Sequence, residues 1–561
     1  MRGRPARGSG ERLALAGIGI GIGACVVALA VYAQTAPSTE RAASEASEAV
    51  RHYPYGSPLR WWDPGSGRVL AAFEEYETPS GSIGIINTAG PIDTKGHPFF
   101  EPVGENGRAC VTCHQPSDGM SLSVATIQER WRETQGQDPL FAAIDGKNCP
   151  HLPQGDEASH SLLLERGLFR IFLPWPPRSA DGTPIEPEFS IEVVRDPTGC
   201  NTHPEHGLDS DEPTISVYRR PRVAGNLRYV VAGGSLFNIK DGSPMDKDPE
   251  TGEPVSMQLM ADARTPTLKT QALDAAHTHL EIASALTDEQ LERIRDFEEQ
   301  IYVAMSHHRA AGRLTGAGTP TALGPDAMAN GEPGLGDNFR SPVFGSFEAW
   351  REPRPGETPE QRAFRESVIR GHDVFFVRPF WIRDVTHLNT VGLGNPIKRT
   401  CATCHNAILT GMDVAPGWMD LGTTTMPWAH VANDVFRTER PWDHAFDLST
   451  AEHGAAEKRA DDRSAELPLF KLTCKPSAMP HPYLGREIYT NDPGRALITG
   501  RCRDIGAITI QQMRGLDARA PYFSNGAART LEELVEYYDQ RFDAQYSEQE
   551  KQDLVNFLSV L

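Results

Sequence analysis

The sequence predicts a mainly α fold of two helical domains related by duplication, with a small strand-rich insertion in the first domain. The pentapeptide Cys-x-x-Cys-His occurs once in each half of the chain, at 110–114 and at 401–405. Residues 261–268 also align without gaps with residues 524–531, at the same relative position in the two halves. Because a helix-compatible stretch and then a capped helix follow each copy, duplication of one helical unit explains the pattern economically.

The clearest helices are expected near the end of each half. Residues 286–290 form a capping sequence before a helical run at 291–302, and residues 546–550 form another before the run at 553–561. Between 168 and 231, short stretches alternate apolar with polar residues, which predicts the strands of the insertion.

Composition sets the predicted boundaries. Four arginines precede an apolar run at 13–32, which is typical of a signal peptide and is also long enough to span a bilayer. Either reading delivers the rest of the chain outside the cytoplasm. Residues 312–342 are rich in Gly, Pro, Ala and Thr without a helical period, which is typical of a linker. The predicted segments are a signal peptide or N-terminal membrane anchor at 1–33, a polar N-terminal extension at the surface at 34–95, a first domain at 96–310 with the insertion at about 150–258, a Gly/Pro-rich linker at 311–360 and a second domain at 361–561.

The net charge excludes one class of partner. The chain has 55 basic and 75 acidic side chains, which gives a formal net charge of -20. We therefore expect no nucleic acid as a partner. An acidic surface would suit a basic electron carrier, but solubility explains the charge equally well.

The repeated pentapeptide carries the chemistry. Its spacing lets two thioethers hold the vinyl groups of one haem while the adjoining histidine binds the iron. A redox dithiol or half of a zinc site is the alternative, and two copies in a chain that looks exported make it remote. We therefore expect two covalently bound c-type haems, each in a cytochrome c-like domain. The predicted attachment residues are Cys110, Cys113, Cys401 and Cys404, and the predicted proximal iron ligands are His114 and His405.

The remaining cysteines support export. Of 9 cysteines, four belong to the haem motifs and one lies in the apolar run. The other four fall as one pair after each motif, and an oxidising compartment would join them. The predicted disulfides are Cys149–Cys200 and Cys474–Cys502, with four buried thiols as the alternative.

Segments at 106–119, 259–279, 398–406 and 514–538 carry a resemblance to a known family. In these segments the chain resembles the di-haem cytochrome c peroxidase superfamily, which includes the methylamine-dehydrogenase maturation enzymes and the rubber oxygenases. The resemblance runs from about residue 97 to 561 and leaves out the linker and part of the insertion. Its haem motifs are specific for haem, and no segment specifies a substrate.

The resemblance implies a periplasmic or extracellular oxidoreductase of the peroxidase type. Its N-terminal haem would react with hydrogen peroxide, and its C-terminal haem would transfer electrons from a small redox protein, a cytochrome c or a cupredoxin. Two alternatives stay open: a haem oxygenase or oxidase that uses dioxygen or peroxide on an organic substrate, and a non-catalytic di-haem electron carrier. The superfamily also allows a calcium ion between the haems, for which the sequence shows no specific ligand signature.

The resemblance also implies catalytic side chains. The family's distal Gln and, ten residues later, Glu fall on Gln271 and Glu281, which would move protons when the O–O bond breaks. Two positions depart from the family. Ala261 stands where many relatives have a Trp between the haems, and Ser524 stands where the second half commonly has His. These departures put rapid electron transfer along the family's route in doubt.

The sixth iron ligands are less clear. For the second haem, Tyr538 occupies the family's methionine position, and a phenolate there would stabilise ferric iron. A tyrosine packed in the terminal helix is the equal alternative. The methionines that follow the second motif could serve instead, namely Met412, Met419 and Met426. For the first haem, His277 and His279 lie in the segment expected over the iron, on different helix faces. We favour His279 as the pocket residue and candidate iron ligand.

Overall fold

The computed structural model describes most of the chain from Arg51 onward. The described residues are 51–179, 181–234, 255–256, 258–331, 347–390, 394–405, 417–426 and 465–561. Within this part, no helix is both long and apolar enough to cross a membrane. The apolar run at 13–32 lies outside the described residues, so the signal peptide and the anchor both remain predictions.

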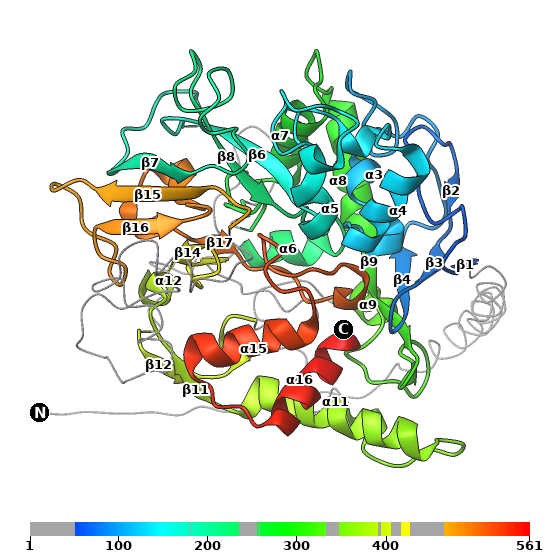
Figure 1. Ribbon diagram of the computed structural model, residues 1–561. Helices are drawn as coiled ribbons and strands as arrows, with labels where there is room; N and C mark the ends of the chain where they lie inside the picture. Colours follow the sequence, from blue (N-terminus) through cyan, green and yellow to red (C-terminus); the bar gives the residue numbers. More distant parts are fainter. Residues whose placement is uncertain are drawn as a thin grey trace, which may run out of the picture. The chain divides into compact units, whose positions relative to one another are not determined.

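A five-stranded sheet in the order β1-β3-β4-β9-β10 joins residues that lie far apart in the sequence. Strand β4 pairs antiparallel with β9, from Gly81 opposite His308 to Asn87 opposite Ile301 (Figure 1). Both strands are buried along almost their whole length, so neither shows the clean alternation of a half-exposed strand. The strands are β1 (Arg51–Tyr53), β3 (Phe73–Glu77), β4 (Gly81–Asn87), β9 (Ile301–His308) and β10 (Gly312–Arg313), and beside them β2 (Val69–Leu70) pairs with β5 (Ile92–Asp93).

This sheet corrects two expected segments. The surface extension expected at 34–95 is wrong for its described residues, because β1, β3 and β4 belong to the sheet and β4 lies in the core. The described part of the expected linker supplies β10 and helix α9 (Pro325–Asn330), which packs against β9. Gly84 shows how close this packing is, since a Cβ there would meet Pro325 Cγ at 2.8 Å.

A four-stranded sheet joins the two halves of the chain. Its order is β14-β16-β15-β7, and β7, from the predicted insertion, pairs antiparallel with β15 over Phe189 to Arg195. The predicted strands of the insertion are confirmed, but one of them is paired with the second half. The strands are β6 (Phe169–Pro174), β7 (Phe189–Arg195), β8 (Thr214–Arg219), β14 (Thr425–Met426), β15 (Leu469–Cys474) and β16 (Glu487–Thr490), and the small ones are β11 (Phe380–Ile382), β12 (Ile397–Arg399), β13 (Trp418–Met419) and β17 (Ile508–Thr509). Both predicted disulfides are confirmed, Cys149–Cys200 and Cys474–Cys502.

A buried ion network also links the halves. Arg219 of β8 places Nη1 2.5 Å from Asp262 Oδ2 and Nε 2.7 Å from Asp492 Oδ2, and all three side chains are buried. The charges of Arg264 and Arg219 outweigh burial and hold the pKa of Asp262 well below its usual range. Asp262 belongs to the segment that is repeated at 524–531, so this network connects the first copy of the repeat to the second half.

The helices begin at the predicted capping sequences. Thr287 and Ser547 each accept a hydrogen bond from the third residue of the helix and form capping boxes. The predicted run at 291–302 ends earlier, because Ile301 already begins β9. The helices are α3 (Cys110–Cys113), α4 (Val124–Thr134), α5 (Ser161–Arg166), α6 (Leu227–Gly234), α7 (Leu268–His279), α8 (Asp288–Gln300), α9 (Pro325–Asn330), α11 (Pro359–Val377), α12 (Thr386–Thr390), α14 (Ala496–Thr499), α15 (Leu531–Phe542) and α16 (Glu548–Ser559).

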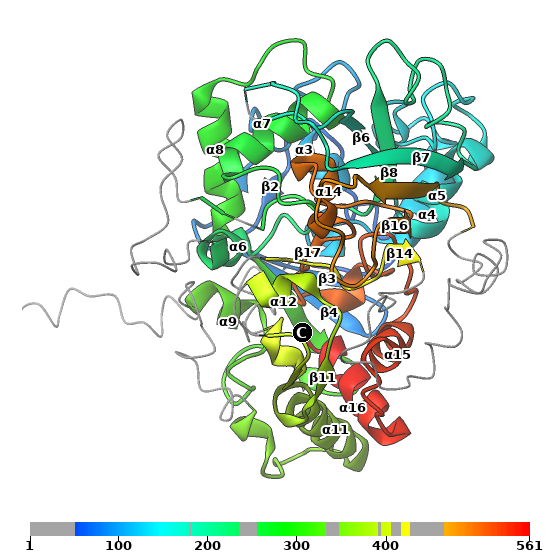
Figure 2. The same ribbon diagram turned by 90° about the vertical axis from the view of Figure 1, so that its left-hand side faces the viewer.

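The repeated segment produces equivalent helix pairs. Thr267 caps α7 and Thr530 caps α15, and each of these helices has 12 residues. Each is followed by a second capped helix, α8 or α16, against which it packs. Figures 1 and 2 both show α7 and α8 in the upper part of the view and α15 and α16 in the lower part.

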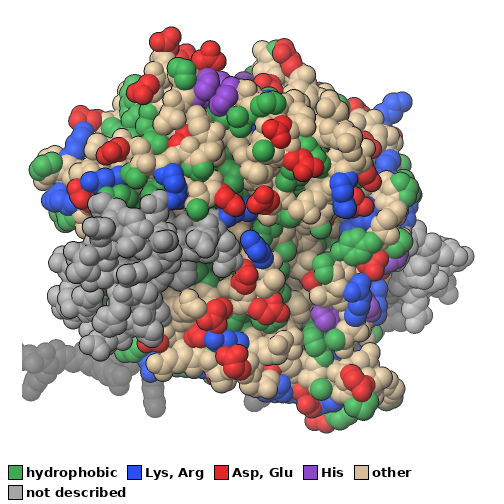
Figure 3. All heavy atoms as spheres, in the orientation of Figure 1, with side chains coloured by type: hydrophobic (Ala, Val, Ile, Leu, Met, Phe, Trp, Pro, Cys, Tyr) green, Lys and Arg blue, Asp and Glu red, His purple; other side chains and the backbone are tan. Residues whose placement is uncertain are grey.

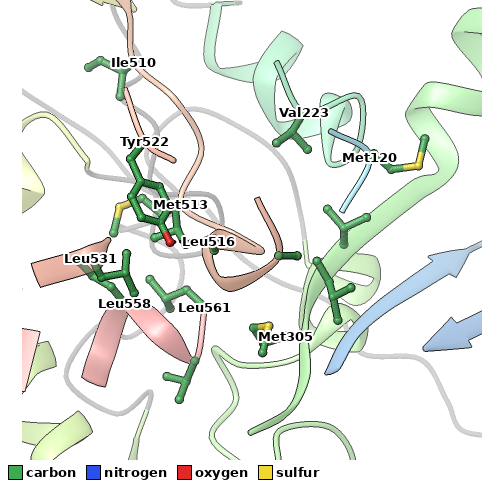
Figure 4. Close-up of a cluster of buried hydrophobic side chains, with 14 of the residues drawn as sticks. Met120, Val223, Met305, Ile510, Met513, Leu516, Tyr522, Leu531, Leu558 and Leu561 are labelled. Atoms are coloured by element: carbon green, nitrogen blue, oxygen red, sulfur yellow. Dashed lines mark hydrogen bonds between the residues drawn. The ribbon is translucent and has the colours of Figure 1, made fainter. Parts of the chain in front are cut away.

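One apolar core runs through both halves. Met120 and Val223 come from the first half, Met305 from β9, and Ile510 and Leu558 from the second half (Figure 4). The expected mainly α fold of two cytochrome c-like haem domains related by duplication is therefore wrong. The structure has 31% helix and 19% strand, close to the average of mixed globular proteins, and strands cross between the halves.

Candidate functional site

The second Cys-x-x-Cys-His motif borders a large cavity. Cys401, Cys404 and His405 line about 1290 Å³ of empty space, part of it open to solvent. The other walls are mainly apolar and come from α11, α15, α16 and the segment 508–516, with Phe375, Phe380, Met419, Leu534 and Phe542 among them.

Tyr538 of α15 lines the same cavity. Its ring centroid is 6.4 Å from that of His405, and the two ring planes are almost perpendicular. Burial raises the pKa of Tyr538 well above its ordinary value, so the phenol keeps its proton unless a strong positive charge lies beside it. Of the alternative ligands, Met419 lines the cavity, Met426 belongs to β14, and Met412 lies outside the described residues. The structure therefore keeps Tyr538 and Met419 as candidates.

Ser524 and Arg519 are among the polar residues that line this mainly apolar cavity. Ser524 is buried and lines the cavity, and among the described residues its hydroxyl group has no hydrogen-bond partner. Since buried hydroxyl groups are usually satisfied, this one is available to a bound molecule. Arg519 also lines the cavity and donates to the carbonyl oxygen of Gln512, and burial lowers the pKa of Arg519 to about 10.

The first motif lies on α3 beside a smaller cavity with about 580 Å³ of empty space, part of it open to solvent. His114 lines this cavity, and its Nδ1 is 3.2 Å from the carbonyl oxygen of Met120. This contact suits a neutral ring that donates from Nδ1 and presents the lone pair of Nε2. Burial lowers the pKa of His114 to about 4, which favours that neutral ring.

The four motif cysteines fit covalent attachment of a haem. Within the described chain, Cys110, Cys113, Cys401 and Cys404 form no disulfide, in contrast to the four cysteines that do. Burial raises the pKa of Cys113 to about 12 and that of Cys401 to about 11, so neither is a reactive thiolate of the redox type. Thiols of this kind, each pair next to a histidine at a cavity, match the donor set of a c-type haem.

Gln271 and Glu281 do not meet at one site. Gln271 lines the cavity of His114, with its Nε2 3.8 Å from Met260 Sδ. Glu281 lies beyond the end of α7 with a φ of 53°, is exposed, and accepts a hydrogen bond from Asn106 at 3.0 Å. The expectation of a distal Glu at 281 is therefore not supported, because the chain turns away from the cavity after the helix.

His279 also lies outside the cavity of His114 and contacts an aspartate instead. Its Nδ1 is 2.6 Å from Asp145 Oδ2, and Asp145 also pairs with the buried Arg108. His279 is not among the described residues that line the cavity of His114, although its charge is one of the influences that lower the pKa of His114. His277 is exposed. We therefore correct the expectation of His279 as an iron ligand: it is a partner of Asp145.

Glu298 is the acidic residue that the sequence reasoning missed. It lies on α8, is 5% exposed, and lines the cavity together with His114 and Gln271. The helical spacing could have identified it, because Glu298 falls seven residues after Leu291 and four after Ile294, on the apolar face of the helix. A carboxylate is rarely buried at a core-facing position, and here the adjoining cavity accounts for it.

One chain segment separates the two cavities. Residues 510–512 line both of them. The segment is held by Gln512, which donates to the carbonyl oxygen of Gly225 and accepts from Asn226. Ala261 stands next to it, since its carbonyl oxygen accepts the N–H of Thr509 at 2.8 Å. A backbone hydrogen bond therefore joins the chain between the cavities to the first copy of the repeat.

Comparison with known proteins assigns no family. No family model matches the chain, and no curated protein matches it at a significant level. A solved structure, titled hydrazine synthase of Kuenenia stuttgartiensis pressurised with xenon, is 14% identical and covers 78% of this chain and 93% of its own. Its TM-score of 0.26 is too low to support any argument about fold or activity.

Proposed function

We propose that this chain is an exported di-haem c-type oxidoreductase of the peroxidase type. Haem would be attached at Cys110 and Cys113 and at Cys401 and Cys404, with one motif histidine under each iron. The observation that carries the proposal is that each motif histidine lines its own cavity and that residues 510–512 form a wall of both. A short path between two redox groups is what a two-electron reduction shared between them needs.

The N-terminal cavity is the proposed site of hydrogen peroxide. A haem bound there supplies the iron and electron for cleavage of the O–O bond. Glu298 holds the proton that the departing oxygen needs, and Gln271 orients the peroxide by hydrogen bonding. Met120 fixes the ring of His114 through its carbonyl oxygen. Glu298 thus takes the role for which Glu281 is badly placed.

The C-terminal cavity is the proposed electron-transfer site. Tyr538 can provide an anionic oxygen once ferric iron lowers the pKa of its phenol, and that oxygen favours the ferric state. The apolar walls keep water away from the haem and so help to set its potential. Electrons would enter from a small redox protein outside the cytoplasm. A calcium ion remains a prediction of the resemblance alone.

The experiment compares two carboxylates on one helix. In steady-state assays with hydrogen peroxide and reduced cytochrome c, Glu298→Gln should lower kcat/KM by about 10²–10⁴-fold, the usual contribution of a general acid. The matched control is Glu292→Gln, an exposed position of α8, which should stay near the wild type. Haem content should be two per chain for all three proteins. Equal activity of both variants would contradict the role of Glu298.

A second candidate function has one observation in its favour. A less apolar cavity with about 1450 Å³ of empty space, part of it open to solvent, adjoins the C-terminal one and shares Thr423, Phe523 and Val535 with it. Such a neighbouring space would suit an organic substrate that is oxidised next to the second haem. Peroxide that binds without turnover of reduced cytochrome c would favour this second function. If both irons are low-spin and their spectra do not change with peroxide or cyanide in any redox state, both functions are contradicted.

A further inference from the structure

Three histidines gather on the surface, away from both cavities. His203 and His206 lie in the loop between β7 and β8, and His151 lies in the loop that precedes α5. Their rings are stacked in the order 151, 203, 206, with centroids 4.2 Å and 4.8 Å apart. Figure 3 shows a group of histidine side chains at the top of the view, above the region of β7 and β8 in Figure 1.

The loops that carry these rings are held in place. The Cys149–Cys200 disulfide joins them two residues before His151 and three before His203. The buried side chain of Asn201 exchanges two hydrogen bonds with the backbone of Ser216 on β8. On the other loop, Lys147 Nζ donates to the carbonyl oxygens of Pro150 and Leu152, on both sides of His151. The histidines therefore stand on preformed supports, and little ordering is left for a ligand to cause.

The donor atoms converge. Ligand atoms of His203, Glu205 and His206 lie within 4.8 Å of one another, and the same limit holds between His151 and His206. A tetrahedral zinc ion with bonds of about 2.0–2.1 Å needs donors roughly 3.4 Å apart, so the donor atoms of His203, Glu205 and His206 would have to move closer together. In the part of the chain that the structure describes, the rings of His151 and His206 form no hydrogen bond. The Nδ1 of His203 accepts the N–H of Glu205 at 3.2 Å.

We propose that His151, His203 and His206, with Glu205 as the fourth ligand, form a binding site for a divalent transition metal, for which zinc is the probe. Three imidazoles and one carboxylate are a donor set that zinc accepts, and copper(II) would bind the same set more tightly. Cys149 is close to two of the rings but its sulfur is in the disulfide and offers no thiolate. A bound metal ion would join the two loops that carry these residues, independently of the haem chemistry.

The test is titration of the untagged, haem-loaded full chain with zinc chloride by calorimetry, without reductant. Reductant is left out because reduction would free the Cys149 thiolate as a competing ligand. We expect one saturable site per chain. His206→Gln and His203→Gln should each weaken it by at least about 100-fold, since loss of a ligand exceeds the 10–100-fold typical of outer partners. The matched control is His52→Gln, an exposed histidine on β1, which should leave the affinity unchanged.

A spectroscopic measurement checks the ligands themselves. X-ray absorption at the zinc edge should show only nitrogen and oxygen neighbours at about 2.0–2.1 Å, with the imidazole signal reduced in His206→Gln. Thermal unfolding of each variant without zinc shows that it is folded. Absence of a saturable site in the wild type would overturn the proposal. Equal zinc affinity in wild type and His206→Gln would overturn it as well.

Discussion

The free energy of unfolding should fall as the pH rises from about 6.5 to 9, because of one buried histidine. His387 is 2% exposed, with Nδ1 3.1 Å from Asp420 Oδ1 and Nε2 3.3 Å from Asp504 Oδ1. Burial alone would lower the pKa of His387. The hydrogen bonds to both carboxylates and their charges outweigh burial and raise that pKa to about 9.

The sign and size of the effect follow from proton linkage. In the unfolded chain a histidine titrates near pH 6.5, so the folded protein holds this proton more tightly. The resulting stabilisation is complete below about pH 6.5 and is lost as the pH rises through 9. One pKa unit corresponds to about 1.4 kcal/mol, and because the two aspartates share the interaction we expect a loss of about 2–3 kcal/mol.

Urea unfolding followed by circular dichroism at pH 6.5 and pH 9 would measure this loss. His387→Gln cannot gain the charge, so its stability should change less between the two pH values than that of the wild type. His52→Gln, on the surface, should behave like the wild type. An equal fall in the wild type and His387→Gln would refute the reasoning. Asp420 lies between Met419 and Leu421, which line the C-terminal cavity, so the spectrum of the haem proposed to bind there should report the same titration.

Two further predictions concern the second haem and the contact between the halves. Tyr538→Phe should change the ferric spectrum and raise the midpoint potential of the second haem. The control Tyr537→Phe loses a hydrogen bond to the carbonyl oxygen of Leu421 and should leave both the spectrum and the potential unchanged. If Tyr538→Phe changes neither the spectrum nor the potential, phenolate ligation is excluded. Arg219→Met should lower the free energy of unfolding by about 3–5 kcal/mol, because two buried carboxylates lose their counter-charge. Urea unfolding would measure this change. A loss below about 1 kcal/mol would show that the network is not a main link between the halves.

Local features of the fold could be predicted from the sequence. Thr287 and Ser547 cap their helices because a capping box involves only four neighbouring residues. The repeat at 261–268 and 524–531 likewise gives equivalent helices. The disulfides follow from an even number of cysteines in two separate groups. In each case the pattern and its structural consequence lie close together in the chain.

The pairing of the strands and the role of one site residue could not be predicted from local sequence patterns. Strand β4 pairs with β9, which begins 214 residues after β4 ends (301 − 87), and β7 pairs with β15 in the other half of the chain. Such pairing depends on distant partners, which short apolar runs do not reveal. The register with the family points to Glu281, but the left-handed turn after α7 places this residue outside the cavity. Glu298 carried a periodic signal that only a visible cavity makes meaningful.

The wall shared by the two cavities has a consequence for maturation. Under the proposed function the chain would be exported from its N-terminus, so the first motif would emerge well before residues 510–512, which line the space beside His114. Attachment of the first tetrapyrrole would therefore take place on an open chain, and later folding would seal it from water. A protein cut short before Ile510 should still become haem-loaded at Cys110 and Cys113, but with an iron that small anions reach freely.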